Sequence, residues 1–225
     1  MVYDPFEWLD LSLDYWNIEV QDTISQISPQ DLINCDTDPG TYGACPAGTS
    51  LVRNAAGRVT SITAGYVNAG LLETDGIDFR MNTNFDLGDM GELSNTLSVA
   101  HVFNYEVTDV TGFTTEYIGN GDPLLGTPET RATLMNNWTY GDFTVGWNVN
   151  YIGANGANDG AKVGGYATND VQLSWKAPWN ATIAVGATNV GDRYPELTAY
   201  DGRPWNFYLY DAYGRTTYFR YTQTF

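Results

Sequence analysis

The chain has 225 residues and a formal net charge of -17, with 24 glycines, 14% aromatic residues and only 16% charged residues. This charge, without any Lys/Arg cluster, excludes nucleic acid as a partner and excludes attachment to an anionic membrane through a basic patch. No segment approaches about 18 consecutive apolar residues, so no transmembrane helix is predicted, and the composition favours a single all-β domain.

The N-terminal stretch is predicted to be a strand almost from the first residue. Four apolar positions alternate with four others: Leu9, Leu11, Leu13 and Tyr15 against Asp10, Ser12, Asp14 and Trp16. No signal-peptide pattern precedes this strand. We therefore expect the chain to be a piece of a longer secreted protein.

The segment from Gln21 to Gly57 is rich in turn-forming residues and holds the only two cysteines, Cys35 and Cys45. Ser28 and Pro29 have the chemistry of an N-cap and a first helical position, so a helical turn is expected there. A zinc site would need further Cys or His ligands, and the only histidine, His101, is distant. We favour a local disulfide over a metal pair, which implies an oxidising compartment.

A long strand is predicted from about Val59 to Asp86. Its C-terminal half has five strongly polar residues on one face, opposite Ile77, Phe79, Met81 and Phe85: Asp78, Arg80, Asn82, Asn84 and Asp86. A packed interior would not accept these five side chains, whereas the watery lumen of a membrane barrel would.

Similar amphipathic strands follow at about Leu93 to Val107, Arg131 to Tyr140, Asp142 to Gly153, Tyr166 to Ala177 and Ala181 to Val190. Asn95 and His101 interrupt the apolar face of the first of these. His101 is interpreted as an ordinary strand side chain, because no nucleophile can be named as its partner. We identify no catalytic residue, metal ligand or cofactor site, so the protein is not expected to be an enzyme.

The last strand runs to the C-terminus and has one apolar and one polar face. Phe219, Tyr221 and Phe225 lie on one side, opposite Tyr218, Arg220, Thr222 and Thr224. The connections alternate in length: those near Gly88, Gly141 and Pro178 are short, and those after Val20, Val107, Gly153 and Gly191 are long. Outer-membrane barrels have this asymmetry.

Four segments in order resemble the C-terminal barrel portion of TonB-dependent outer-membrane receptors: LSLDYWNIEVQDTI, YVNAGLLETDGIDFRMNTNFDL, TNVGDRYPEL and YDAYGRTTYFRYTQTF. The resemblance implies an antiparallel transmembrane β-barrel segment of about eight up-and-down strands, the last third of a barrel of about 22 strands. In that family the segment matching Asn189 to Pro195 ends the penultimate strand. The family also has external loops with paired cysteines, similar to CDTDPGTYGAC.

The resemblance implies location in the outer membrane of a Gram-negative bacterium and energy-coupled uptake of a scarce nutrient such as an iron chelate, cobalamin or an oligosaccharide. Residues 1–225 would form a partial barrel domain, without the plug domain and signal peptide. The terminal aromatics Tyr221 and Phe225 resemble the signal read by the barrel-assembly machinery. Membrane lipid and the nutrient are further partners, and the TonB-type coupling protein is contacted only through the missing N-terminal part.

Two other functions remain open: a free-standing eight-stranded outer-membrane barrel and a soluble extracellular carbohydrate-binding β-sandwich. The loop from Asp192 to Tyr213 is dense in aromatic residues, including Tyr194, Tyr200 and Phe207. Either it belongs to an interfacial aromatic girdle, or Arg203, Trp205 and Tyr208 face the ligand. Acidic residues in other loops, at Asp109, Glu116 and Asp122, favour a neutral or sugar-like ligand.

Overall fold

The computed structural model describes residues 1–225 except 111, 123–125, 157–161 and 199–201. Two compact units are present: Met1–Trp16, Gly76–Phe103 and Ile118–Phe225 form unit 1, and Asn17–Asp75 with Asn104–Tyr117 form unit 2. None of the described helices is long and apolar enough to cross a membrane.

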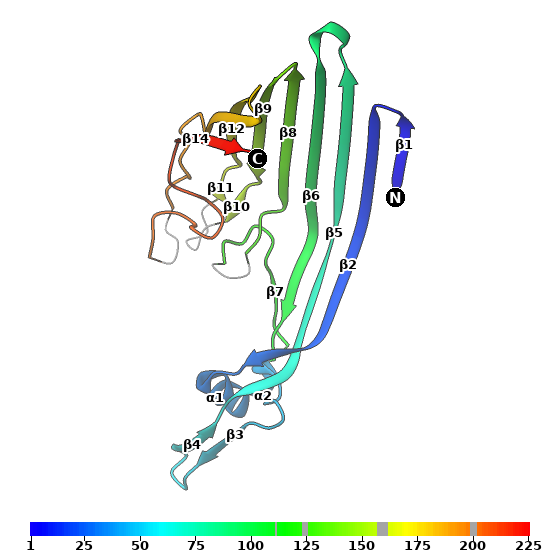
Figure 1. The fold of residues 1–225 in the computed structure, drawn as a ribbon. Helices are drawn as coiled ribbons and strands as arrows, with labels where there is room; N and C mark the ends of the chain where they lie inside the picture. Colours follow the sequence, from blue (N-terminus) through cyan, green and yellow to red (C-terminus); the bar gives the residue numbers. More distant parts are fainter. Residues whose placement is uncertain (111, 123–125, 157–161, 199–201) are drawn as a thin grey trace. The chain divides into compact units, whose positions relative to one another are not determined.

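The chain is dominated by antiparallel strands (Figure 1). The main sheet contains ten strands in the order β1-β2-β5-β6-β8-β9-β12-β13-β14, with β7 paired to β6. Their bounds are β1 Val2–Phe6, β2 Leu9–Gln26, β5 Tyr66–Asp86, β6 Glu92–Thr108, β7 Thr114–Glu116, β8 Thr130–Tyr140, β9 Phe143–Ile152, β12 Tyr166–Ala177, β13 Ala181–Thr188 and β14 Thr216–Gln223.

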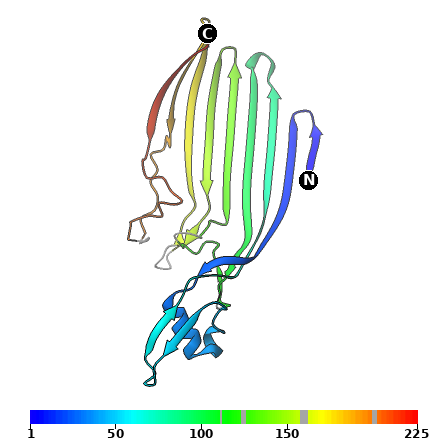
Figure 2. The same ribbon diagram turned by 60° about the horizontal axis from the view of Figure 1, so that its bottom comes forward.

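Eight of these strands are long and follow one another in an up-and-down path, which confirms the predicted fold class. Figure 2 shows the strands of unit 1 side by side in this order. No pairing joins β1 to β14, the two ends of the path, both of which are fully described. A single meandering sheet contradicts the sandwich hypothesis, and the open path contradicts a closed eight-stranded barrel.

The strand registers place the apolar residues on one face. Directly opposed residues of antiparallel strands share a face. One row crosses six strands: Leu93 faces Trp138, Trp138 faces Val145, Val145 faces Leu173, Leu173 faces Val185 and Val185 faces Phe219. The other face has a matching polar and small-residue row, Asn137, Gly146, Gln172, Gly186 and Tyr218. The predicted alternation therefore extends across the sheet from β6 to β14.

Polar residues that interrupt the apolar face form hydrogen bonds within the sheet. Asn95 Nδ2 donates to Thr83 Oγ1 at 2.9 Å, and Asn136 Nδ2 donates to the backbone oxygen of Trp147 at 2.9 Å. Such bonds lower the cost of placing an amide on an apolar face.

Short turns join β5 to β6, β8 to β9 and β12 to β13, as predicted. The turns contain Gly88, Gly91, Gly141 and Asn180, all with positive φ, a backbone conformation that favours glycine and asparagine. The η1 turn, Gly88–Met90, lies in the first of these.

The rim of the sheet near the short turns is lined with aromatic side chains, which sequence analysis did not predict. Ring pairs lie close at Phe6–Trp8 (5.1 Å), Trp8–Phe85 (5.2 Å), Trp138–Tyr140 (6.1 Å), Phe143–Trp175 (6.3 Å) and Trp175–Trp179 (5.4 Å). Aromatic rows of this kind are typical of the bands where membrane barrels meet the lipid headgroups.

Three predicted strand bounds were wrong. β1 is a separate strand that forms a hairpin with β2, and β14 ends at Gln223, so Phe225 lies beyond it. The predicted strand from Val59 is two strands: β4, Val59–Thr63, pairs with β3, Ser50–Arg53, and β5 begins only at Tyr66. Alternation continues through Ala64 and Gly65, so the pattern alone did not reveal the break.

Unit 2 has a small core of its own around α1, Pro29–Thr37. Ser28 is the N-cap and Pro29 opens the helix, as predicted, and Asp31 completes a capping box with Ser28. Ile27, Leu32 and Cys35 are buried against Leu51, Ile62 and Val110. The remaining helix is α2, Pro39–Tyr42, and a second small pairing, in unit 1, joins β10, Asn155–Gly156, to β11, Lys162–Val163.

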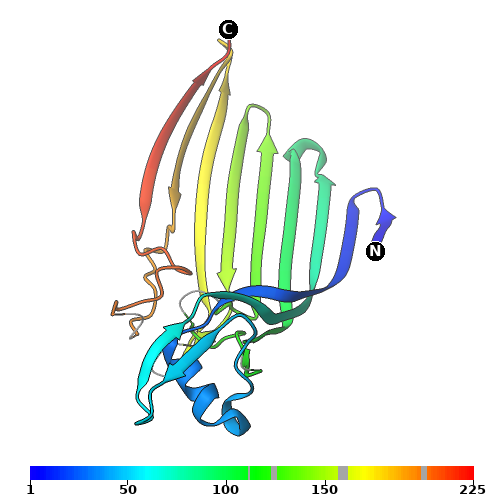
Figure 3. The same ribbon diagram turned by 90° about the horizontal axis from the view of Figure 1, so that it is seen from below.

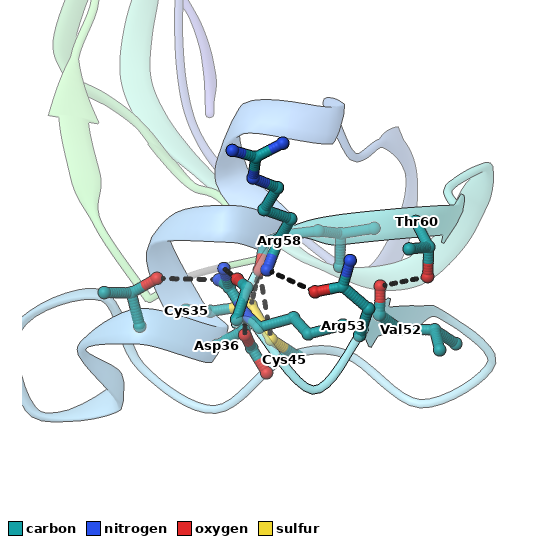
Figure 4. A network of polar contacts seen from close by, with 11 residues as sticks. Cys35, Asp36, Cys45, Val52, Arg53, Arg58 and Thr60 are labelled. Atoms are coloured by element: carbon teal, nitrogen blue, oxygen red, sulfur yellow. Dashed lines mark hydrogen bonds and ion pairs between the residues drawn. A yellow bond between two sulfur atoms is a disulfide. The ribbon is translucent and has the colours of Figure 1, made fainter.

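Cys35 and Cys45 form a disulfide with a Cα–Cα distance of 5.3 Å. Arg53 Nε donates to Asp36 Oδ2 at 2.8 Å beside it, and an Arg53 guanidinium nitrogen donates to Thr37 Oγ1 at 3.1 Å (Figure 4). These contacts join the C-terminal half of α1 to β3.

Candidate functional site

The connection between β13 and β14 begins with a tightly bonded corner at Asn189. This residue is buried and has a positive φ of 47°. Its Oδ1 accepts from Arg193 N at 2.9 Å, its Nδ2 donates to Arg193 O at 2.7 Å, and its backbone N donates to Asp170 Oδ1 at 2.7 Å. The predicted end of the penultimate strand is confirmed, since β13 stops at Thr188.

Arg193 fastens this corner to the start of β12. Its guanidinium donates to Gly165 O at 2.9 Å and to Ala167 O at 3.3 Å, and lies 5.1 Å from the ring centroid of Tyr166. Tyr166 Oη donates to Arg193 O at 3.0 Å in return. Residues in the NVGDRYP segment therefore build the base of the connection.

A second bond closes the far end of the connection. Asp192 Oδ1 accepts from Arg215 N at 2.8 Å. Gly214 has a φ of 68°, and a Cβ there would lie 2.5 Å from Tyr194 Oη and 2.7 Å from Asp192 Oδ1. Glycine is therefore required for this closure.

Tyr210 of the connection, Val163 of β11 and Tyr166 of β12 form a buried cluster, the loop core, against which Ile152, Trp205 and Leu209 pack. The rings of Tyr166 and Tyr210 meet edge to face at 5.2 Å. The Tyr210 hydroxyl is buried and has no hydrogen-bond partner among the described residues. Burial raises the pKa of Tyr210, and the Arg131 guanidinium opposes this in part.

Figure 3 shows the connection between β13 and β14 at the end of these strands opposite the C-terminus. An aromatic pocket of about 560 Å³ lies in this connection. Its lining consists of Trp205, Phe207, Tyr208, Leu209, Tyr210, Asp211, Ala212 and Tyr213. The rings of Phe207 and Tyr208 are 4.2 Å apart. A pocket of this size with aromatic walls can stack on a flat ligand surface.

The three predicted ligand-contact residues, Arg203, Trp205 and Tyr208, have different surroundings in the structure. Trp205 and Tyr208 line the pocket, but Trp205 also packs on the loop core, whereas Tyr208 is exposed. The Arg203 guanidinium lies 3.7 Å from the centroid of the Phe207 ring and is not among the lining residues. Tyr200 lies outside the described residues.

Phe207 is one of the pocket residues that the sequence did not identify as ligand contacts. It both lines the pocket and supports Arg203. The only signal for it was the aromatic density of the loop, which does not distinguish one ring from another.

Other candidate polar residues have structural contacts. His101 Nδ1 lies 2.9 Å from Thr130 Oγ1, and His101 Nε2 lies 3.7 Å from Glu129. Asp109 Oδ1 accepts from Phe113 N at 3.1 Å, and Glu116 Oε1 accepts from Tyr105 N at 3.2 Å. In the part of the chain that the structure describes, no group of three or more His, Cys, Asp and Glu residues is placed to hold a metal ion.

The terminal aromatics lie at the end of the sheet near the short turns. Tyr221 faces Ile183 on the apolar face, and Tyr221 Oη donates to Gln223 Oε1 at 2.6 Å. Phe225 is fully exposed. Gln223 Nε2 donates to Trp179 O at 3.0 Å, which holds the end of β14 against the last turn.

Comparisons with known proteins find receptors that are similar to this chain in sequence or in fold. The metal-pseudopaline receptor CntO of Pseudomonas aeruginosa is 29% identical over 143 residues, which is 59% of this chain and 19% of that protein. The siderophore receptor PirA of Acinetobacter baumannii is similar with a TM-score of 0.60 at 15% identity, over 98% of this chain and 30% of that one.

A variant of the ferric enterobactin receptor PfeA of Pseudomonas aeruginosa has a TM-score of 0.63 at 14% identity, over 100% of this chain and 30% of that one. These identities are too low to carry more than the fold. The chain spans about a fifth of the length of the curated relative and about three tenths of the solved structures.

The family model described as "TonB dependent receptor-like, beta-barrel" matches residues 1–190. It covers the sheet from β1 through β13 and the Asn189 corner, the same elements whose registers give the sheet its two faces. The chain belongs to the TonB-dependent receptor β-barrel family.

Proposed function

We propose that this chain forms the C-terminal part of an outer-membrane receptor that captures a scarce nutrient outside a Gram-negative cell and moves it into the periplasm. The observation that carries the proposal is the open meander of eight long strands with one apolar face and one polar face. The chain spans only a small part of the length of its relatives, which supports a barrel wall that further strands complete.

In this arrangement the apolar row from Leu93 to Phe219 contacts lipid, and the polar row from Asn137 to Tyr218 faces the lumen. The aromatic rim near the short turns lies at the periplasmic headgroups. The long connections, including the aromatic pocket, then lie on the external side, where ligand arrives.

The proposed ligand is a metal chelate. Relatives are named for siderophores and for a metal complex of pseudopaline. Trp205, Phe207 and Tyr208 offer ring faces for such a ligand. The chain would act by binding and transport, with no reaction catalysed.

Two protein partners belong to the same proposal. The exposed Phe225 and the apolar-face Tyr221 would be bound by the barrel-assembly machinery. The TonB-type coupling protein would contact an N-terminal part outside this chain.

The test is uptake in metal-starved cells that carry the receptor containing this chain. Labelled ferric enterobactin, a labelled metal–pseudopaline complex, cobalamin and a maltooligosaccharide are supplied in turn, with and without an uncoupler of the proton-motive force. Accumulation of a metal chelate that the uncoupler abolishes is expected. Accumulation of none of the four, or accumulation that the uncoupler leaves unchanged, would contradict the proposal.

A further inference from the structure

A groove of about 490 Å³ lies on the apolar face of unit 1, over β13 and its neighbours. On this face it is lined by Val145, Val171, Leu173, Val185, Ala187 and Thr217. The strands that border it, β9, β12, β13 and β14, all belong to this chain. The apolar face is the outer one in the proposed barrel, so neither a plug nor the rest of the wall would cover the groove.

The groove follows from the sizes of the side chains in two neighbouring rows. Ala187 is directly opposite Val171 and Thr217, and all three side chains are short. In the next row, toward the short turns, Val185 is opposite the longer Leu173 and Phe219. The Thr217 hydroxyl is the only side-chain polar group among the apolar-face residues that line the groove. Such a groove suits a hydrocarbon chain, because a polar ligand would lose its hydration there without compensation.

A polar contact on the same face marks where the apolar surface ends. Trp147 is directly opposite Val171, and its Nε1 donates to Asn169 Oδ1 at 3.0 Å. Asn169 lies two residues from Val171 toward the long external connection, so by alternation it is on the same face. Tryptophan with a polar partner is typical of the boundary between hydrocarbon and headgroups. The external headgroups therefore begin just beyond the Ala187 row.

Arg215 lies at this boundary. It precedes Thr217 by two residues, about 7 Å along an extended chain and on the same face by alternation. Its Nη1 donates to Val190 O at 3.3 Å, so the guanidinium is directed toward β13 and away from the free edge of β14. Asp192 contacts only the backbone N of Arg215, at 2.8 Å, and no ion pair of Arg215 is present in the described part of the chain. Most of its N–H donors are left for an anion.

We propose that this groove and Arg215 form a binding site for one phosphate-bearing lipid of the external leaflet. In a Gram-negative outer membrane that lipid is lipopolysaccharide, whose lipid A part has phosphates next to its acyl chains. One acyl chain lies along the Ala187 row, and a phosphate accepts two parallel hydrogen bonds from the Arg215 guanidinium. The inference rests on the membrane orientation proposed above and extends it from a general lipid-facing surface to one lipid site.

Two lipid probes separate the phosphate from the acyl chains. The intact receptor is purified in dodecyl maltoside, freed of native lipid, and titrated with diphosphoryl lipid A or with the same lipid after its phosphates are removed. Native mass spectrometry measures the affinity of the first bound lipid. We expect diphosphoryl lipid A to bind at least about tenfold more tightly than the dephosphorylated form.

Substitutions locate the two contacts. Arg215→Gln should weaken binding of diphosphoryl lipid A about tenfold and leave the dephosphorylated form unchanged. Arg220→Gln, on the polar face of the same strand, is its matched control. Ala187→Phe should fill the groove and weaken both lipids. Ala132→Phe, on the apolar face outside the groove and opposite Val99 and Tyr151, is the control for added bulk. Neither control should change binding.

Assembly of each variant is checked by the heat-dependent gel shift. Arg215→Leu or Ala187→Leu replaces a variant that does not assemble. The inference would be overturned if the wild type bound the two lipids equally, if Arg215→Gln bound as Arg220→Gln does, or if Ala187→Phe bound as Ala132→Phe does. Lipid binding is measured without any uptake, so these outcomes are distinguishable from failure of the transport function.

Discussion

Tyr218 Oη donates a 2.9 Å hydrogen bond to Gln172 Oε1, from β14 to β12, and the Tyr218 ring lies over Gly186 of the strand between them. A Cβ at Gly186 would lie 2.5 Å from the Tyr218 ring and from its hydroxyl, and 2.7 Å from the backbone oxygen of Val171. An aromatic side chain over a strand glycine fills the space that the missing side chain leaves.

Gly186→Val should therefore displace Tyr218 and destabilise the receptor by about 1 to 3 kcal/mol, the usual cost of overpacking. Urea-dependent unfolding in detergent micelles measures this cost. Gly146→Ala is the matched control on the same polar row, where a Cβ meets only Asn137 Oδ1 at 3.3 Å and Gln172 at 3.9 Å. Equal losses in the two variants would disprove the role of Tyr218.

The disulfide should stabilise the small core of unit 2. Replacing Cys45 with Ser removes a bridge across a sequence separation of 10 residues, which in the chain-entropy model restricts the unfolded state by about 2.5 to 3 kcal/mol. Protease digestion should then cut near α1 at lower enzyme concentration, while the sheet of unit 1 stays intact. Both thiols reacting with alkylating agent in unreduced protein would refute the bridge.

Tyr210→Phe should not destabilise the β13–β14 connection, because the lost hydroxyl is buried without a partner. The expected change in unfolding free energy is within about 0.5 kcal/mol. Tyr210→Ala should cost several times more, since it removes a ring from the loop core.

The same residue gives a pH dependence. Burial raises the folded-state pKa of Tyr210 above its ordinary value of about 10. The contribution of the neutral phenol to the stability of the connection is therefore fully present at a pH below about 10. This stability is lost as pH rises through the raised folded pKa. The wild-type connection should become protease-sensitive at high pH before the Tyr210→Phe variant does; identical profiles would contradict the assignment.

Replacing Tyr208 should reduce ligand binding alone, whereas replacing Trp205 should also reduce the stability of the loop. Tyr208→Ala removes an exposed pocket wall, so chelate binding should fall about tenfold with normal assembly. Trp205→Ala also removes a ring that packs on Val163, Tyr166 and Tyr210, so it should reduce both binding and loop stability. Unchanged chelate binding with impaired assembly in both variants would place these rings in a structural girdle.

Most strands of the sheet could be predicted from the alternation of apolar and polar side chains alone. Phe143 to Tyr151 alternates without interruption, and a one-residue slip would exchange the two faces, so both the strand and its register are strongly specified. The resemblance located the NVGDRYP segment at the end of the penultimate strand. It did not predict that the segment forms a hydrogen-bonded corner, because that corner depends on contacts with Asp170 and Tyr166, which are distant in the sequence.

The misassigned elements share a physical cause. β4 directly precedes the long strand β5 in the sequence, yet it pairs with β3, because the buried Ile27, Leu32 and Cys35 offer a local surface for Leu51 and Ile62. The position of Arg203 was unpredictable for the same reason. Its partner, the Phe207 ring, lies in the same loop, and the sequence of that loop has no periodicity from which the contact could be predicted.

The lipid-facing assignment of the apolar row is tested most directly by arginine substitution on opposite faces of neighbouring strands. Val145→Arg and Val185→Arg should each lower the unfolding free energy of the receptor in lipid bilayers by about 2 to 4 kcal/mol, because the charge enters the hydrocarbon. Asn148→Arg and Ser174→Arg, on the polar face, should cost well under half as much. Equal costs on the two faces would contradict a membrane barrel with this orientation, and with it the receptor function proposed for the chain.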